Sequence, residues 1–209
     1  MTGAVLVVTA VGAEADAVRG GARDAVHVSA AGVGPAAAAG GTARLLALAE
    51  AAGTPYRAVI SAGIAGGFDG RAAVGATVLG VRSIAADLGA ESPAGFLPVE
   101  TLGFGTSVIE ADGELLASLT AALPEAVRGD ILTLCTVTGS GATAARLARA
   151  HPAAVAEAME GYGVASAATA AAVPFAELRT VSNPVGPRDR ASWRIATALA
   201  ALTKAAAAL

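Results

Sequence analysis

The sequence predicts an α/β fold within one domain. Its 209 residues are 55% hydrophobic and 15% charged, which is enough apolar material to bury a sizeable core. Short apolar runs such as residues 4–10 are continuous rather than alternating, as expected for strands covered on both faces. Alanine-rich stretches follow several of these runs, and no linker interrupts them. We therefore expect residues 1–209 to form a single domain.

The composition also excludes several kinds of partner. The net charge is −3 without a basic cluster, whereas nucleic acid requires many cations on one face. Cys135 is the only cysteine, which excludes an intramolecular disulfide and a cysteine zinc site. Residues 5–11 lack the cationic leader of a secretory signal, and the uncharged residues 161–176 are too short to span a bilayer. We expect a cytoplasmic protein with a small-molecule partner and no membrane segment.

The first strand, residues 4–10, leads to Glu14. This position lies just beyond the carboxyl end of a strand, where open α/β sheets place ligands. Position alone favours a solvated glutamate in the first turn of a helix, with a ligand-binding residue as the alternative.

Residues 26–31 form the second expected strand, and a helix follows from Pro35 to about Ala52, because proline suits the first helical position. The turn between them reads GxGxxA at residues 32–37. A dinucleotide site would also need an acidic residue at the end of the next strand, and Glu50 lies inside the helix instead. An ordinary strand-to-helix turn is favoured.

A third strand at residues 57–61 runs into a glycine-rich turn at residues 62–68. Three glycines there would let a ligand approach the backbone, with N–H groups free to bind an oxygen or a ring nitrogen. An ordinary turn that needs positive φ is an equal alternative.

Residues 73–81 read as another strand, and residues 83–106 as a long loop rich in Gly and Pro. Loops of this length are often lids or binding loops. Phe96 and Phe104 could wall an aromatic part of a ligand, although they could also simply anchor the loop. Asp87 and Glu91 are expected to be solvated.

Leucines at helical spacing predict a core helix over residues 114–123. A strand at residues 131–137 and a polar turn at 138–141 precede a helix from Ala142 to about Ala150. His27 and His151 are the only histidines and have no acidic partner at ligand spacing, so we expect no metal site.

A brief strand at residues 155–159 leads to a helix from Glu160 to Ala172, and a strand at 175–181 runs into Asn183. A helix and the strand after it run in opposite directions, which brings Glu160 and Asn183 to one rim of the sheet. Gly161 and Gly163 each cost a helix roughly 1 kcal/mol relative to alanine, so something must require small residues there.

The final segment contains Asp189, a candidate cap for the last helix. Trp193 and Ile195 are expected on the buried face of that helix, and Arg188 and Arg190 in solvent.

These rim residues together resemble the nucleoside phosphorylase and nucleosidase superfamily along essentially the whole chain. Its glycine loop is similar to GIAGG at 63–67, its ribose motif to ME at 159–160, and its purine motif to RTVSN at 179–183. Within it, the chain resembles the futalosine hydrolases through VTA at 8–10 leading to Glu14, ETLGF at 100–104, MEGYG at 159–163 and SNPVG at 182–186.

The resemblance implies a three-layer αβα fold with a central mixed, mostly parallel sheet. It implies an N-glycosyl hydrolase of menaquinone biosynthesis that releases hypoxanthine from futalosine, leaves dehypoxanthine futalosine and needs no cofactor. Relatives usually form dimers or larger assemblies, so we expect a homo-oligomer.

The resemblance also implies roles for particular residues. Glu14 would activate water, which Arg179 would help to orient, and Glu160 would hold the ribose hydroxyls with Met159 against the sugar. Further substrate-binding positions are Gly63, Ala65, Gly66, Ser182, Phe96 and Phe104. The two phenylalanines, Arg188 and Arg190 are candidates for the carboxylated aryl group of futalosine.

Asn183 departs from the adenine-cleaving nucleosidases, which carry aspartate at this position. A carboxamide supplies a donor and an acceptor, which can match O6 and N7 of a 6-oxopurine. Asparagine cannot act as a general acid, so we infer that it stabilises the charge of the departing base by hydrogen bonding.

Four alternative functions stay open. A phosphorylase is disfavoured because residues 32–40 and 62–68 contain no arginine to bind phosphate. A nucleosidase for another 6-oxopurine nucleoside and a non-catalytic nucleoside-binding protein would keep the same pocket, although a mere binder has little use for Glu14. A Rossmann-type reductase would bind a nicotinamide cofactor.

Overall fold

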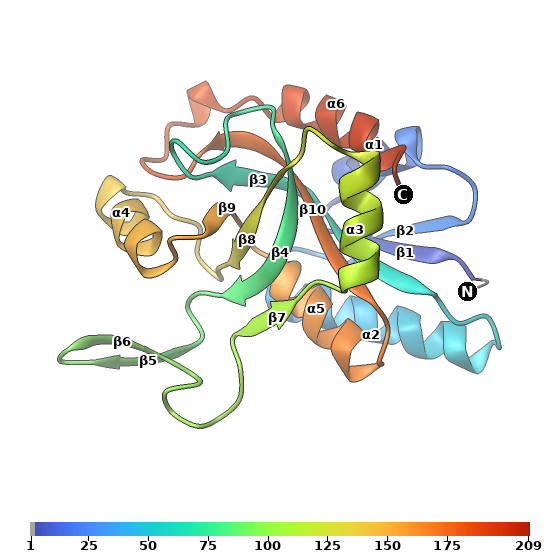
Figure 1. Cartoon of the computed structure of the whole chain (residues 1–209), viewed down its shortest axis with the longest axis horizontal. Coiled ribbons are helices and arrows are strands. Elements are labelled where there is room, and N and C mark those ends of the chain that lie inside the picture. Colours follow the sequence, from blue (N-terminus) through green and yellow to red (C-terminus); the bar gives the residue numbers. More distant parts are fainter. Residues whose placement is uncertain (1–2) are drawn as a thin grey trace.

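Strands and helices alternate along much of the computed structural model, which describes residues 3–209, and five strands follow one another between residues 58 and 110 (Figure 1). The strands are β1 (Val5–Thr9), β2 (Val26–Ala30), β3 (Ala58–Gly67), β4 (Thr77–Ala85), β5 (Gly89–Ser92), β6 (Gly95–Pro98), β7 (Val108–Glu110), β8 (Val127–Thr133), β9 (Ala154–Ala158) and β10 (Phe175–Pro184). The helices are α1 (Gly12–Gly21), α2 (Pro35–Ala51), α3 (Gly113–Ala122), α4 (Gly141–Ala150), α5 (Gly161–Ala170), the short 3-10 helix η1 (Arg190–Ser192) and α6 (Ile195–Ala206).

The main sheet is mixed, and its strands follow the order β10-β4-β8-β9-β3-β1-β2, with β7 beside β4. Parallel pairs join β1 to β2 and β3, β3 to β10, and β8 to β4 and β9. Antiparallel pairs join β10 to β4, β3 to β9, and β4 to β7. Because β10 pairs with both β3 and β4, a closed ring forms from the five strands β10, β4, β8, β9 and β3. This closure brings the carboxyl ends of β3, β9 and β10 together.

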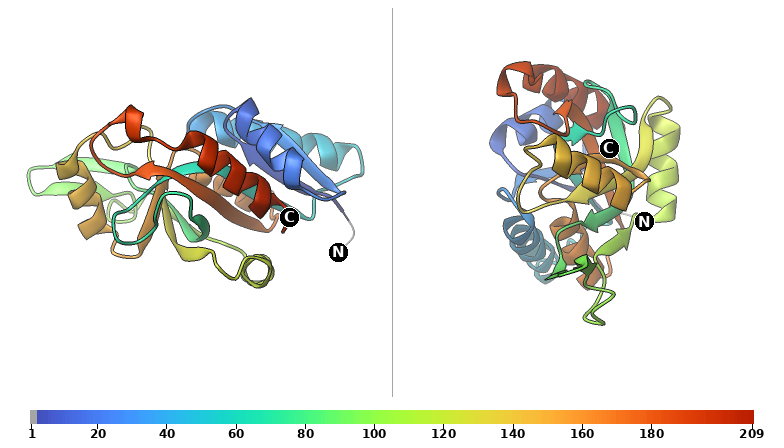
Figure 2. Two further views of the ribbon diagram at one scale, coloured as in Figure 1. Left: turned by 90° about the horizontal axis from the view of Figure 1, so that it is seen from above. Right: turned by 90° about the vertical axis from the view of Figure 1, so that its left-hand side faces the viewer.

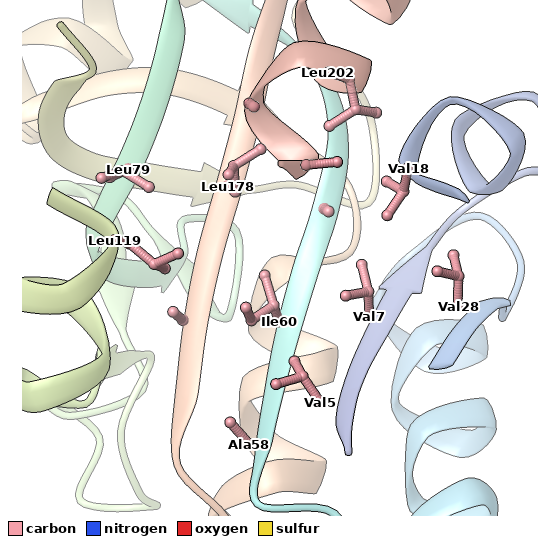
Figure 3. Packing of buried hydrophobic residues seen from close by; sticks show 14 of the residues in the cluster. Val5, Val7, Val18, Val28, Ala58, Ile60, Leu79, Leu119, Leu178 and Leu202 are labelled. Carbon is pink, nitrogen blue, oxygen red and sulfur yellow. The ribbon is translucent and has the colours of Figure 1, made fainter. Parts of the chain in front are cut away.

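Helices pack on both faces of the β1 region, as the alternation of its side chains shows. Val5 and Val7 join the buried cluster that includes residues of α1 and α6, such as Val18 and Leu202 (Figure 3). Leu6 packs in a second cluster with residues of α2 and α5. Helices α1 and α6 lie side by side in both views of Figure 2. Since side chains alternate along a strand, one short apolar run fills two cores.

The prediction of a glycine-rich turn at residues 62–68 was wrong, because β3 continues as a strand to Gly67. Residues 63–67 pair with β10, and Gly66 and Gly67 also pair with β9. A side chain at Gly67 would lie 2.2 Å from the carbonyl oxygen of Ala72. The glycines therefore permit close packing within a sheet rather than a turn.

Two predicted strands are displaced by four residues. The strand expected at 73–81 is β4 at Thr77–Ala85, and the strand expected at 131–137 is β8 at Val127–Thr133. The start of β8 reads VRGD, which is too polar to suggest a strand. Its Asp130 is buried because Arg82 of β4 binds it with Nε–Oδ1 at 2.9 Å. An ion pair between neighbouring strands thus replaces the apolar pattern.

The segment after Trp193 also differs from prediction. Asp189 caps η1, since its Oδ1 accepts from the N–H of Ala191, and it does not cap α6. Trp193 precedes α6, and Ile195 is 41% exposed rather than buried. Within the described part of the chain, no helix combines the length and apolar character needed to cross a membrane.

Candidate active site

A cavity of about 260 Å³ opens where β1, β3, β9 and β10 end. Its lining includes most of the residues that the sequence predicted for the site: Glu14, Ala65, Gly66, Met159, Glu160, Ser182 and Asn183. The ring closure of the sheet is what brings these distant segments together. The prediction that Glu160 and Asn183 share one rim agrees with this lining.

Glu14 is fixed by backbone N–H groups from two segments. Its Oε2 accepts from Ala10 at 3.0 Å and Val11 at 3.2 Å, and its Oε1 accepts from Ile64 at 2.9 Å. The side chain is 4% exposed, so it is not the solvated residue that position alone favoured. The third residue of α1 thus becomes an oriented carboxylate at the edge of the cavity.

Glu160 lies at the N-cap of α5, where the partial positive charge of the helix favours a carboxylate. Its Oε1 accepts from the N–H of Gly34 at 3.2 Å. Gly34 has φ of +91°, a conformation that glycine adopts without strain. The turn at residues 32–37 therefore positions a site glutamate, in agreement with the preference for an ordinary strand-to-helix turn.

Arg179, which the resemblance assigned to orienting water, is not among the residues that line the cavity and makes no hydrogen bond to Glu14. Its Nε donates to Glu177 at 2.9 Å, its Nη2 to Ser61 at 2.9 Å, and its Nη1 lies 3.5 Å from Glu160. Arg179 is buried in β10, and these contacts use three of its five N–H groups. Its Nη1 group faces the Glu160 carboxylate.

Glu177 completes this buried network. Its second oxygen accepts from Ser83 at 2.7 Å, and its side chain is 1% exposed. Burial raises the pKa of Glu177, although Arg179 and Ser83 act in the opposite direction. Burial alone would lower the pKa of Arg179, but Glu177 and the nearby Glu160 and Glu14 carboxylates raise it overall.

Glycines around the site leave room for these side chains. A Cβ on Gly63 would lie 2.6 Å from Glu14 Oε1 and 2.7 Å from Arg179 Nη1, so Gly63 provides clearance and does not itself line the cavity. A Cβ on Gly161 would lie 2.2 Å from both carboxylate oxygens of Glu177. A Cβ on Gly163 would lie 2.1 Å from the carbonyl oxygen of Pro35 in α2. Both unusual helix glycines therefore have the steric reason that we expected.

Asn183 presents an oriented carboxamide to the cavity. Its Oδ1 accepts from Ser182 Oγ at 2.8 Å, and its Nδ2 donates to the carbonyl of Pro184 at 3.0 Å. Ser182 Oγ also lies 3.2 Å from the carbonyl oxygen of Ala65. One N–H and one lone pair of Asn183 stay available for a ligand.

Phe96 and Phe104 do not line the cavity. Residues 89–98 form a hairpin of β5 and β6 that projects from the main sheet (Figure 1). Phe96 is 39% exposed and Phe104 is 82% exposed. The expected loop is partly a hairpin because Gly89–Ser92 and Gly95–Pro98 pair with each other. Phe96 lies in this hairpin, and Phe104 lies in the turns that follow it.

Sequence reasoning missed three residues of this region. Glu157 and Trp193 line the cavity, and Glu177 lies just behind it. The signal for the two glutamates was a charged residue within an otherwise apolar strand. Glu177 and Arg179 are two residues apart in such a strand, hence on the same side. Trp193 had no such signal, because its position depends on where the last helix starts.

No group of three or more metal-ligating side chains occurs among residues 3–209. The polar groups at the cavity are carboxylates, an amide and hydroxyls. This arrangement can bind a sugar, orient water and recognise a planar base.

The comparisons with known proteins agree with this geometry. A model of the phosphorylase superfamily matches residues 5–209. The solved 5′-methylthioadenosine/S-adenosylhomocysteine nucleosidase of Neisseria meningitidis has a TM-score of 0.82 and 21% identity, covering 99% of this chain and 98% of that chain. At this identity the likeness concerns the fold alone. Fold and family model together define a nucleoside phosphorylase-like α/β protein.

Two relatives are much more similar in sequence. The futalosine hydrolase of Streptomyces coelicolor is 55% identical over 87% of this chain and 77% of its own length. The futalosine hydrolase of Acidothermus cellulolyticus is 48% identical over 98% of this chain and 89% of its own length. This chain therefore belongs to the futalosine hydrolase family of the phosphorylase superfamily.

Proposed function

We propose that this protein hydrolyses the N-glycosidic bond of futalosine. The products are hypoxanthine and dehypoxanthine futalosine, and the reaction belongs to menaquinone biosynthesis. The two relatives with 55% and 48% identity support this substrate. We also propose that residues 1–209 act as one nucleosidase domain with three αβα layers, in the cytoplasm and as a homo-oligomer.

The negative charge of the cavity favours water over phosphate as the nucleophile. Three glutamates line it, Glu14, Glu157 and Glu160, and no Lys or Arg of the described chain does. Arg179 is enclosed behind the lining by Glu177, Ser61 and Glu160. A phosphate dianion would meet carboxylates without the cations that normally bind it. Neutral water is the nucleophile that this cavity accepts.

Glu14 is the residue that activates the water. Its Oε1 accepts one backbone N–H, from Ile64 at 2.9 Å, so it keeps the capacity to accept a proton from water. The water oxygen forms a bond to C1′ of the ribose as its proton passes to Glu14. The bond from C1′ to the purine breaks, and its electron pair leaves with the base. General base catalysis of this type contributes typically about 10²- to 10⁴-fold.

Glu160 and Met159 hold the sugar in this scheme. Glu160 can accept hydrogen bonds from the ribose hydroxyls because its own orientation is set by Gly34 and Arg179. The Met159 side chain lies in the same lining and offers an apolar surface to the ribose ring. Fixing the ribose aligns C1′ with the water beside Glu14.

Asn183 stabilises the departing base. Its free N–H donates to the oxopurine as negative charge develops there, which is electrostatic catalysis rather than proton transfer. The hydrogen bonds from Ser182 and to Pro184 orient the amide before the substrate arrives.

The carboxylated aryl group of futalosine has a matching feature beside the cavity. Trp193 lines the cavity, and the guanidinium carbons of Arg188 and Arg190 lie 5.2 Å and 5.9 Å from the centre of its ring. An aromatic face next to two cations suits a ring that carries a carboxylate. We assign the aryl group to these three residues, in place of Phe96 and Phe104.

The experiment is a hypoxanthine assay with futalosine or inosine as substrate. Wild-type protein should prefer futalosine, and replacing both Arg188 and Arg190 by Ala should lower kcat/KM for futalosine while leaving that for inosine nearly unchanged. Equal losses on both substrates would refute the aryl assignment. Equal kcat/KM for both substrates in the wild type would instead favour a general 6-oxopurine nucleosidase, and no turnover would favour a binding protein.

A further inference from the structure

Glu157 is a buried carboxylate to which the proposed reaction assigns no role. It lies in β9, lines the cavity and is only 5% exposed. No ion pair holds it among residues 3–209. Burying an unpaired carboxylate is costly unless hydrogen bonds compensate. Its presence in a cavity wall therefore calls for a chemical reason.

Thr138 orients this carboxylate. The Thr138 N–H donates to Glu157 Oε1 at 2.7 Å, and the Thr138 hydroxyl donates to Glu157 Oε2. Both oxygens of Glu157 thus act as acceptors towards Thr138. Each oxygen has a further lone pair. Glu157 can therefore accept one more hydrogen bond from a ligand in the cavity.

The sheet register places Glu157 and Asn183 on either side of one glycine. Glu157 pairs with Gly66 of β3, and Gly66 pairs with Asn183 of β10. A Cβ on Gly66 would lie 3.4 Å from Asn183 Nδ2, so the amide occupies the same face of the sheet. Two strand spacings separate the two backbones by about 10 Å. A carboxylate and a carboxamide thus flank Gly66 in the cavity wall, and the Val185 side chain lies beside the same glycine, with Cγ2 3.0 Å from where a Cβ would be.

Hypoxanthine and adenine differ on the edge that such a pair would contact. Hypoxanthine has an N1–H donor beside its O6 acceptor, whereas adenine has an N1 acceptor beside its amino group. A carboxylate attracts the N1–H of hypoxanthine and repels the N1 lone pair of adenine. An amide that donates to O6 or N7 leaves N1–H in need of an acceptor on the other side.

We propose that Glu157 is a second base-recognition residue, which accepts the N1–H of a 6-oxopurine while Asn183 contacts O6 and N7. This inference rests on the proposed function for its choice of base. Asn183 alone discriminates weakly, because its oriented carboxamide keeps both a free N–H donor and a free lone pair. The Thr138-bound carboxylate cannot offer a donor, and it therefore sets the preference against 6-aminopurines.

The test measures binding of the free bases hypoxanthine, 1-methylhypoxanthine and adenine to the wild type and to Glu157→Gln by calorimetry. Wild-type protein should bind hypoxanthine most tightly. A charged hydrogen bond is worth roughly 10- to 100-fold in affinity, so Glu157→Gln should weaken hypoxanthine by about that factor. The same variant should leave 1-methylhypoxanthine nearly unchanged and improve adenine, because a glutamine N–H can donate to adenine N1.

If Glu157 only anchors the turn at Thr138, Glu157→Gln should weaken the binding of all three bases by similar factors. That result would overturn the proposal. If Glu157→Gln does not fold, the wild type still decides, since equal affinity for hypoxanthine and 1-methylhypoxanthine also overturns it. Futalosine turnover is measured separately. If Glu157→Gln changes the base preference but the wild type does not turn over futalosine, only the proposed substrate is refuted. If the wild type turns over futalosine but Glu157→Gln has the same base preference as the wild type, the proposed role of Glu157 is refuted.

Discussion

Replacing Gly161 by Ala should destabilise the protein, although alanine is the better helix former. The change gains about 1 kcal/mol in helix propensity. It also places a Cβ 2.2 Å from both carboxylate oxygens of Glu177, and because Glu177 bonds to Arg179 and Ser83, its displacement breaks a buried ion pair. Breaking such a pair costs about 3–5 kcal/mol, so the net loss is about 2–4 kcal/mol.

Thermal unfolding followed by circular dichroism measures this loss. For a chain of this size, 1 kcal/mol corresponds to about 2–4 °C, which predicts a fall in Tm of roughly 4–16 °C. Gly40→Ala is the matched control, because Gly40 lies in α2 with no atom within 4 Å of a new Cβ. It should raise Tm slightly. If Gly161→Ala raised Tm as the control does, Glu177 would not need the space that Gly161 leaves.

Three further predictions concern the cavity. Glu14→Gln should reduce kcat by at least about 100-fold, the low end for a general base, with substrate affinity nearly unchanged; an unchanged kcat would remove its assigned role. Asn183→Asp should lower activity on 6-oxopurine nucleosides more than on 6-amino ones, and an equal loss would contradict base recognition. Burial raises the pKa of Glu157 against the effect of Thr138, so the stability linked to its proton is lost as pH rises through that pKa. The Tm of Glu157→Gln relative to wild type should therefore increase from pH 4 to pH 8, and a constant difference would argue against a raised pKa.

Local patterns were sufficient to predict most elements and much of the candidate site. The apolar run of β1, Pro35 at the start of α2, and Ser182 and Asn183 at the end of β10 are read from neighbouring residues. The opposite directions of α5 and β10 then bring Glu160 and Asn183 to one rim. These inferences depend on short-range sequence, and the structure agrees with them.

The rest depends on contacts between distant segments. The strand β3 continues through its glycines because β9 and β10 pair with it, and neither pairing is visible in residues 62–68. The role of Arg179 in orienting water was taken from the resemblance, and its hydrogen bond to Ser61 of β3 is not visible in the residues around it. Glu157 gains its place only through its register with Gly66. The homo-oligomer and the cytoplasmic location stay predictions.

The most direct test of the central claim is hypoxanthine release from futalosine by the purified protein, with and without inorganic phosphate. A cavity lined by three glutamates predicts equal release in both conditions, with dehypoxanthine futalosine as the other product. Release that requires phosphate and yields a sugar phosphate would contradict it.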